Sequence, residues 1–86
     1  GGSGGAIYAD GNRFTIHIAG SLIEHNDAVE GGGAVFFVSN DRTGTLSIED
    51  SVLRDNHSGG FETRGYPGIF FLGAGSPTVS NSTLSP

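Results

Sequence analysis

The sequence predicts an all-β fold in which a short chain winds into a parallel β-solenoid. Its 86 residues make one small domain, 16 of them are glycine, and only 15% are charged. The apolar residues are mainly Ile, Val, Leu and Phe, which favour strands, and no stretch has the period of a helix with one buried face. Similar segments recur at intervals of about 30 residues, which is typical of a solenoid.

The first repeated element is a glycine run followed by a short apolar strand. It occurs as "GGAIY", "GGAVFF" and "GIFF", so that Ile7 aligns with Val35 and Ile69, and Tyr8 aligns with Phe36 and Phe70. Glycines at the start of each unit predict a corner where the backbone takes a positive φ.

The second and third elements are an alternating strand and an "S-x-[IL]" strand, separated by a corner. Residues 15–26 align with residues 45–56 without a gap at an offset of 30, and Val79 and Ser82 align with Ile48 and Ser51 at an offset of 31. The pattern predicts three short strands per coil and three coils, at about 4–31, 32–66 and 67–86.

These motifs resemble a known architecture. The arrangement "GGAIY…SLIEHN…GGGAVFF…SVLRDN" is similar to the right-handed parallel β-helix of the pectate-lyase-like superfamily. More closely, it resembles the "GGA[IVL]…FxxN" repeats of chlamydial polymorphic outer-membrane proteins and related bacterial surface adhesins. Ile23, Leu53 and Leu84 stand in place of the family's Phe, and the third coil lacks the Asn. The resemblance implies right-handed winding and a structural or adhesive role at the cell surface.

Two polar columns are expected to form ladders along the solenoid. Ser21, Ser51 and Ser82 each lie two residues before an aliphatic residue, so serine and aliphatic side chains should both point inward. Such serines can bond to one another or to the corner backbone. Asn26 and Asn56 end matching coils, where Asn is expected to adopt the left-handed conformation and to bond to the next coil.

An aromatic column is expected on the outer face of the first sheet. Branched aliphatic residues suit the core, so the column of Ile7, with Ala9, Phe37 and Phe71 on the same face, should point inward. Tyr8, Phe36 and Phe70 would then form an outer stripe that could contact glycans or a protein. The opposite arrangement, with the aromatic column inside, stays open.

Residues 58–66, "SGGFETRGY", are longer than the matching connection of the first coil and should bulge from the stack. Long insertions in solenoids often carry specificity, so Phe61, Arg64 and Tyr66 are candidate contact residues. A mobile loop is the alternative.

Several functional classes have little support. The net charge of −5, with four Arg and no Lys, argues against nucleic-acid binding. No apolar run approaches the ~18 residues of a membrane helix. His17, His25 and His57 lack metal-ligand spacing, and we interpret His25 with Asp55 as a surface pair. Asp10 and Asp41 are expected in loops, and Asp50 and Asp55 at a corner and a strand end, as turn residues rather than a lyase site.

Asn56 and Asn81 begin N-glycosylation sequons, "NHS" and "NST". We list both as candidate glycosylation sites, and expect Asn81 to stand at an exposed corner.

The sequence therefore predicts a structural or adhesive β-solenoid segment, extracellular or at the cell surface, without enzymatic activity, cofactor or metal. Its expected partners are copies of itself stacked head to tail or further coils of the same chain, because both ends should present unpaired strand edges and no cap. Glycans are another expected partner. The alternative is a fragment of a carbohydrate-active or carbohydrate-binding β-helix protein.

Overall fold

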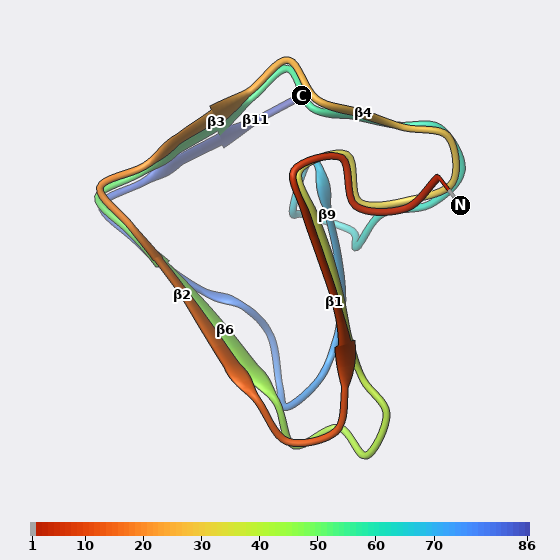
Figure 1. The fold of residues 1–86 in the computed structure, drawn as a ribbon. Coiled ribbons are helices and arrows are strands. Elements are labelled where there is room, and N and C mark those ends of the chain that lie inside the picture. Colours follow the sequence, from red (N-terminus) through yellow and green to blue (C-terminus); the bar gives the residue numbers. More distant parts are fainter. Residues whose placement is uncertain (1) are drawn as a thin grey trace.

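A computed structural model describes residues 2–86, which form strands and turns and no helix. Seen along its axis, the chain follows the same path repeatedly (Figure 1). The first coil contains β1 (Ile7–Gly11), β2 (Thr15–Ala19), β3 (Leu22–Glu24) and β4 (Asp27–Ala28); the second contains β5 (Val35–Ser39), β6 (Thr45–Glu49), β7 (Val52–Arg54) and β8 (His57–Ser58); the third contains β9 (Ile69–Leu72), β10 (Thr78–Ser80) and β11 (Thr83–Ser85). No helix long and apolar enough to cross a membrane occurs in this part of the chain.

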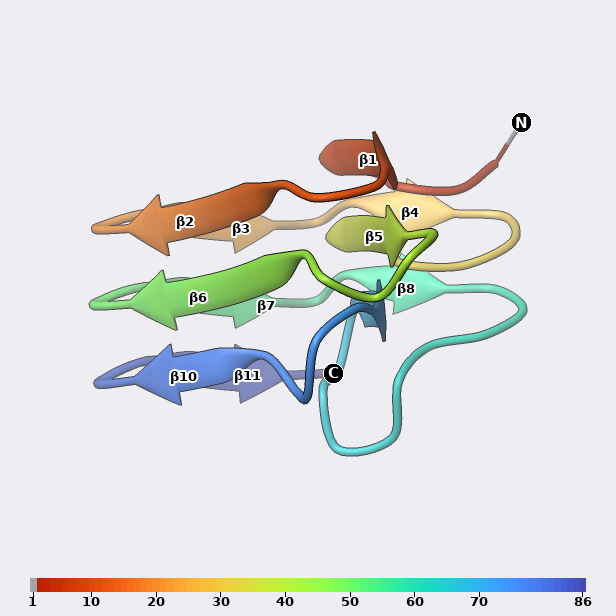
Figure 2. The ribbon, with the colours of Figure 1, turned by 90° about the horizontal axis from the view of Figure 1, so that it is seen from below.

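Equivalent strands of successive coils pair in parallel and form the walls of the solenoid. The three-stranded sheets have the orders β1-β5-β9, β2-β6-β10 and β3-β7-β11. Their register follows the repeat in the sequence, since Val35 pairs with both Ile7 and Ile69. The predicted all-β solenoid of about three coils of three strands is confirmed. In Figure 1 the chain runs clockwise from the nearest coil to the farthest, so the winding is right-handed, and Figure 2 shows the coils one above another.

A fourth, two-stranded sheet pairs β4 with β8. It was not predicted, because Asp27–Ala28 and His57–Ser58 have neither alternating hydrophobicity nor β-branched residues. Parallel pairing with the equivalent segment, rather than local propensity, makes these residues strands.

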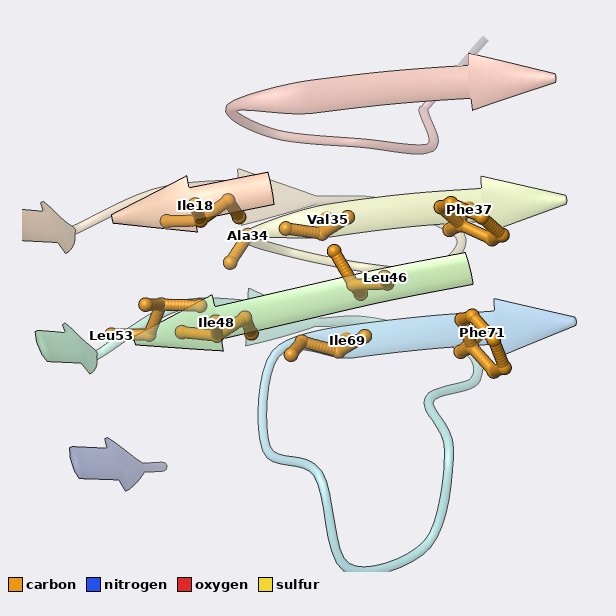
Figure 3. Packing of buried hydrophobic residues seen from close by; sticks show 9 residues of the cluster. All are labelled: Ile18, Ala34, Val35, Phe37, Leu46, Ile48, Leu53, Ile69 and Phe71. Atoms are coloured by element: carbon orange, nitrogen blue, oxygen red, sulfur yellow. The ribbon is translucent and has the colours of Figure 1, made fainter. Parts of the chain in front are cut away.

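The core lies between the sheets and consists mainly of the inward-facing residues of the three-stranded sheets (Figure 3). In β5, Val35 and Phe37 are fully buried while Phe36 between them faces outward. Phe37 stacks on Phe71 of the next coil, with ring centroids 4.8 Å apart. The aliphatic column of Ile7, Val35 and Ile69 thus contributes to the core.

The corners are made by residues with positive φ. Gly4 and Gly32 precede the first strand of their coils with φ of 75° and 65°. At the corner after the third strand, His25 and Asp55 have φ of 59° and 55°. The expectation that Asn26 and Asn56 adopt the left-handed conformation is therefore wrong: the residue before each Asn makes the turn, and the two Asn side chains bond between the first and second coils.

Candidate functional site

The serine column links the three coils through one repeated contact. The Ser21 N–H donates to Ser51 Oγ at 3.1 Å, and the Ser51 N–H donates to Ser82 Oγ at 3.0 Å. Each hydroxyl in turn donates to the carbonyl two residues earlier in its own coil. The same donor and acceptor recur at each level, so the ladder has a direction.

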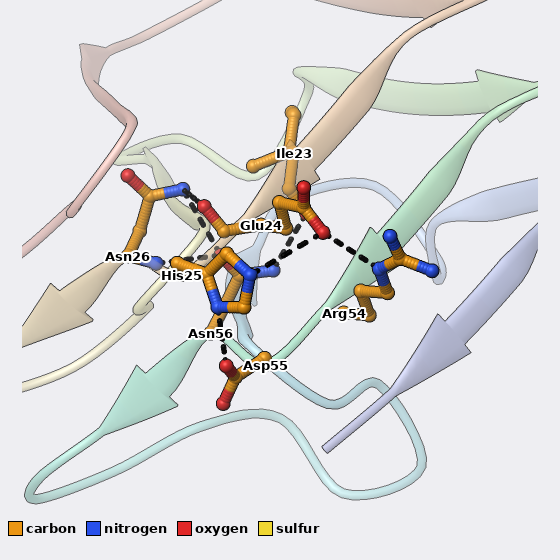
Figure 4. A network of polar contacts seen from close by, with 7 residues as sticks. All are labelled: Ile23, Glu24, His25, Asn26, Arg54, Asp55 and Asn56. Atoms are coloured by element: carbon orange, nitrogen blue, oxygen red, sulfur yellow. Dashed lines mark hydrogen bonds and ion pairs between the residues drawn. The ribbon is translucent and has the colours of Figure 1, made fainter.

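The asparagine column has the same direction (Figure 4). Asn56 Oδ1 accepts from the Asn26 N–H at 3.2 Å and from Asn26 Nδ2 at 3.0 Å. Asn56 Nδ2 donates to the carbonyl of Ile23 at 3.0 Å. Only 5% of Asn56 is exposed. The side chain of Asn56 therefore satisfies the corner backbone of the first coil.

The two candidate glycosylation sites differ in burial. Asn56 is 5% exposed and its amide nitrogen donates to the Ile23 carbonyl, so a glycan there would require this corner to open. Asn81 lies at an exposed corner, where its Nδ2 donates to Asp50 Oδ1 at 2.6 Å.

Three histidines pair with carboxylates of a neighbouring coil. His25 Nδ1 bonds the carboxylate of Asp55, and His57 Nδ1 lies 2.9 Å from Asp27 Oδ1. His17 Nε2 lies 3.0 Å from Glu49 Oε1, a pair that the repeat alignment did not indicate because position 47 is serine. These side chains are exposed to solvent, which screens such pairs.

The acidic residues considered for a lyase site stay in separate local structures. Asp10 lies within β1 rather than in a loop, and it accepts from Asn40 Nδ2 at 3.0 Å. Asp41 lies in a turn, where the hydroxyl of Thr43, 2.7 Å away, lowers the pKa of the Asp41 carboxyl. Within residues 2–86 no group of three or more His, Cys, Asp or Glu side chains is placed to hold a metal ion.

The aromatic column lies on the outer face of the first sheet. Tyr8 and Phe36 stack with centroids 5.1 Å apart and Phe36 and Phe70 with centroids 5.3 Å apart. Tyr8 is 59% exposed, whereas Phe36 and Phe70 are half-buried. Among the described residues Phe36 has a stacked ring on both faces, whereas Tyr8, at the end of the column, has one on a single face.

Residues 58–66 contribute to this surface and to the core. The ring of Phe61 packs edge-on against the ring of Phe70, with centroids 4.9 Å apart, and extends the aromatic surface to one side of the column. Tyr66 packs against the hydrophobic core. Arg64 is exposed and forms no ion pair with the rest of the described chain. The three candidate contact residues of this segment are thus not brought together as one site.

The same segment covers the outer edge of β9. The Thr63 N–H donates to the carbonyl of Ile69 at 2.7 Å, and the Phe71 N–H donates to Thr63 Oγ1 at 2.7 Å. The carbonyl of Tyr66 accepts from the Ile69 N–H at 3.0 Å. The expectation of two uncapped ends is therefore wrong for the first sheet at the C-terminal end. Sequence reasoning missed Thr63, because it has no counterpart in the repeat.

The N-terminal end is more open. β1, β2 and β3 are outer strands of their sheets, and within residues 2–86 each has a neighbour on one side only. Four apolar residues of this coil remain only partly buried against the core: Ile7, Phe14, Ile16 and Ile23.

A solvent-open cavity of ≈ 220 Å³ lies at the other end. Its lining consists of Asp55, Asn56, His57, Ser58, Glu62 and Pro86. Since Pro86 belongs to the third coil, the cavity lies beside β8 on the side away from β4. It marks the place where the fourth sheet has two strands and the other sheets have three.

Comparisons with protein-family models, with curated proteins and with solved structures find no match to this chain. The parallel solenoid is therefore established from the chain's own strands and their register.

Proposed function

We propose that this chain is a structural, non-enzymatic β-solenoid segment that carries further parallel coils at its N-terminal end. The unpaired strand edges at that end are the main support. β1, β2 and β3 offer one edge each to a further strand, and strand edges of this kind pair readily with other chains. The added coil belongs either to the same chain or to a second one.

The partly buried apolar residues of the first coil favour the same role. Ile16 and Ile23 lie at the N-terminal end of columns whose next members, Leu46 and Leu53, are almost completely buried. A coil above them would remove the remaining apolar surface from water, which stabilises by about 25 cal/mol per Å².

An extracellular or cell-surface setting goes with this role, because the glycine and Asn motifs resemble those of bacterial surface adhesins. The aromatic face of Tyr8, Phe36, Phe70 and Phe61 is the surface that an adhesive contact would use.

Adding a coil tests the proposal. Repeating residues 5–32 directly after Gly32 adds a second copy of the first coil at the N-terminal end, because Gly4 and Gly32 occupy equivalent corners. In a stack of repeats, each added interface contributes to stability. We expect the melting temperature to rise, by about 4–8 °C for each kcal/mol gained.

The matched control carries the same inserted residues in scrambled order, and we expect its melting temperature to stay at or below that of the natural chain. If both insertions behave alike, and the amides of the repeated coil exchange as in an unfolded chain, the proposal is wrong.

A further inference from the structure

We propose that residues 58–66, here called the cap segment, close the C-terminal end to further coils, so that coils join this chain at its N-terminal end only. This inference rests on the proposed function and adds the direction of assembly and the chemistry of the partner.

The hydrogen bonds of the cap segment replace those of a further strand. Gly68 accepts from the Val35 N–H, so the backbone groups of Ile69 and Phe71 face the opposite, outer edge of β9. Thr63 bonds two of these groups: its N–H donates to the Ile69 carbonyl, and its hydroxyl oxygen accepts from the Phe71 N–H. The Ile69 N–H donates to the Tyr66 carbonyl. A new strand could pair with β9 only after Thr63 has left.

Burial shows that the cap segment also covers the core at this sheet. Ile69 is fully buried and Phe71 is 8% exposed, although β9 is an outer strand. Val79 and Leu84, in the other two outer strands of the third coil, are only partly buried. Tyr66 packs against the core and its carbonyl accepts from the Ile69 N–H, so the cap segment lies against this sheet and not against the other two.

The cap segment is fastened in its middle and at its end. In its middle, the Phe61 N–H donates to the Glu30 carbonyl at 2.8 Å, the Phe61 ring packs against Phe70, and Glu62 Oε2 accepts from the Gly68 N–H at 3.0 Å. At its end, the Tyr66 carbonyl accepts from the Ile69 N–H at 3.0 Å. Figures 2 and 3 show the segment extending past the third coil, below the strand that carries Ile69 and Phe71. It therefore also occupies the space that a fourth coil would need.

The direction of the polar ladders identifies the partner of the N-terminal end. Each level donates an N–H to the side-chain oxygen of the level below it. Among residues 2–86, Ser21 Oγ and Asn26 Oδ1 receive no such N–H, so the N-terminal end presents acceptors. The matching surface is the C-terminal end of a parallel coil that presents N–H donors and lacks a cap. A second N-terminal end would bring acceptor against acceptor.

Two intact copies therefore cannot join head to tail, whereas a chain without the cap could. Such a contact is heterologous and does not close, so it should propagate. Deleting residues 62–65 gives the connection of the second coil the length of the first, and Tyr66→Gly restores glycine at the position equivalent to Gly32. We expect this uncapped variant to grow in mass with concentration in light scattering, and the natural chain not to grow.

Point substitutions test the cap contact without changing the chain length. Thr63→Val removes the hydroxyl and should speed hydrogen exchange of the Phe71 amide about fivefold or more, whereas Thr63→Ser should leave it nearly unchanged. Equal exchange in the two variants would overturn the cap contact. If the uncapped variant does not fold, light scattering of the two point variants replaces it. Thr63→Val should then grow in mass with concentration, and Thr63→Ser should not.

The outcomes separate the two proposals. Adding Ile16→Lys to the uncapped variant should abolish its growth, and Val52→Lys, on the outer face of the middle coil, should not. If the natural chain grows in mass like the uncapped variant, the proposal that the cap segment closes the C-terminal end is wrong. It is also wrong if the uncapped chain stays monomeric while the repeated-coil protein is stabilised. Failure of the repeated coil itself overturns the proposed function.

Discussion

At the scale of single residues, polar side chains inside the solenoid bond backbone groups at the corners between strands. Asn56 supplies one acceptor and one donor to the corner of the first coil, at a position that is almost completely buried. The role of this column follows from the sequence, because Asn26 and Asn56 align at the same corner. The backbone conformation does not, because the positive φ falls on the residue before each Asn.

Asn56→Ala should lower the free energy of unfolding by about 1–2 kcal/mol, because the Asn26 N–H and the Ile23 carbonyl both lose a partner at a corner where Asn56 is only 5% exposed. Urea unfolding followed by circular dichroism measures the change. Asn12→Ala is the control, since Asn12 is exposed and its side chain makes no hydrogen bond within the described chain. Equal stabilities of the two variants would contradict the ladder.

At the scale of strands and corners, the repeat predicts what recurs and misses what occurs once. The repeat aligns Ile7 with Val35 and Ile69, and these residues pair in the first sheet, so its register could be predicted from the sequence. Thr63 and β8 were missed for opposite reasons: Thr63 has no equivalent in the other coils, and His57–Ser58 has no strand pattern of its own. Only contacts across coils define them.

The glycine corner gives a prediction at this scale. At Gly32, φ is 65° and an added Cβ would lie 2.3 Å from the carbonyl oxygen of Val35. Gly20 has a similar φ of 57° and open space around it. Gly20→Ala should therefore lower the free energy of unfolding by about 1 kcal/mol, because of the left-handed conformation alone. Gly32→Ala should lower it by about 1–3 kcal/mol more, because the added Cβ also forces the backbone to shift. Thermal unfolding of the two variants compares them; equal costs would show that the corner relaxes freely.

At the scale of the whole molecule, the two ends differ, and the difference comes from one segment. Both end coils leave apolar residues partly exposed, but only the third coil has its first sheet covered, by Thr63 and Tyr66. Solenoids of this kind open from their ends, because each coil contacts only its neighbours. The N-terminal coil should accordingly be the first to open.

Hydrogen exchange at three equivalent positions tests this order. The Val35 N–H donates to Gly68 in the middle of the first sheet, the Ile7 N–H to Ala34 in the open coil, and the Ile69 N–H to Tyr66 in the cap. We expect Val35 to exchange most slowly, Ile7 fastest, and Ile69 between them, and we expect Thr63→Val to move Ile69 toward Ile7. An Ile69 amide that exchanges as fast as Ile7 in the natural chain would mean that the cap opens as readily as the bare end, and a cap of that kind could not set the direction in which coils are added.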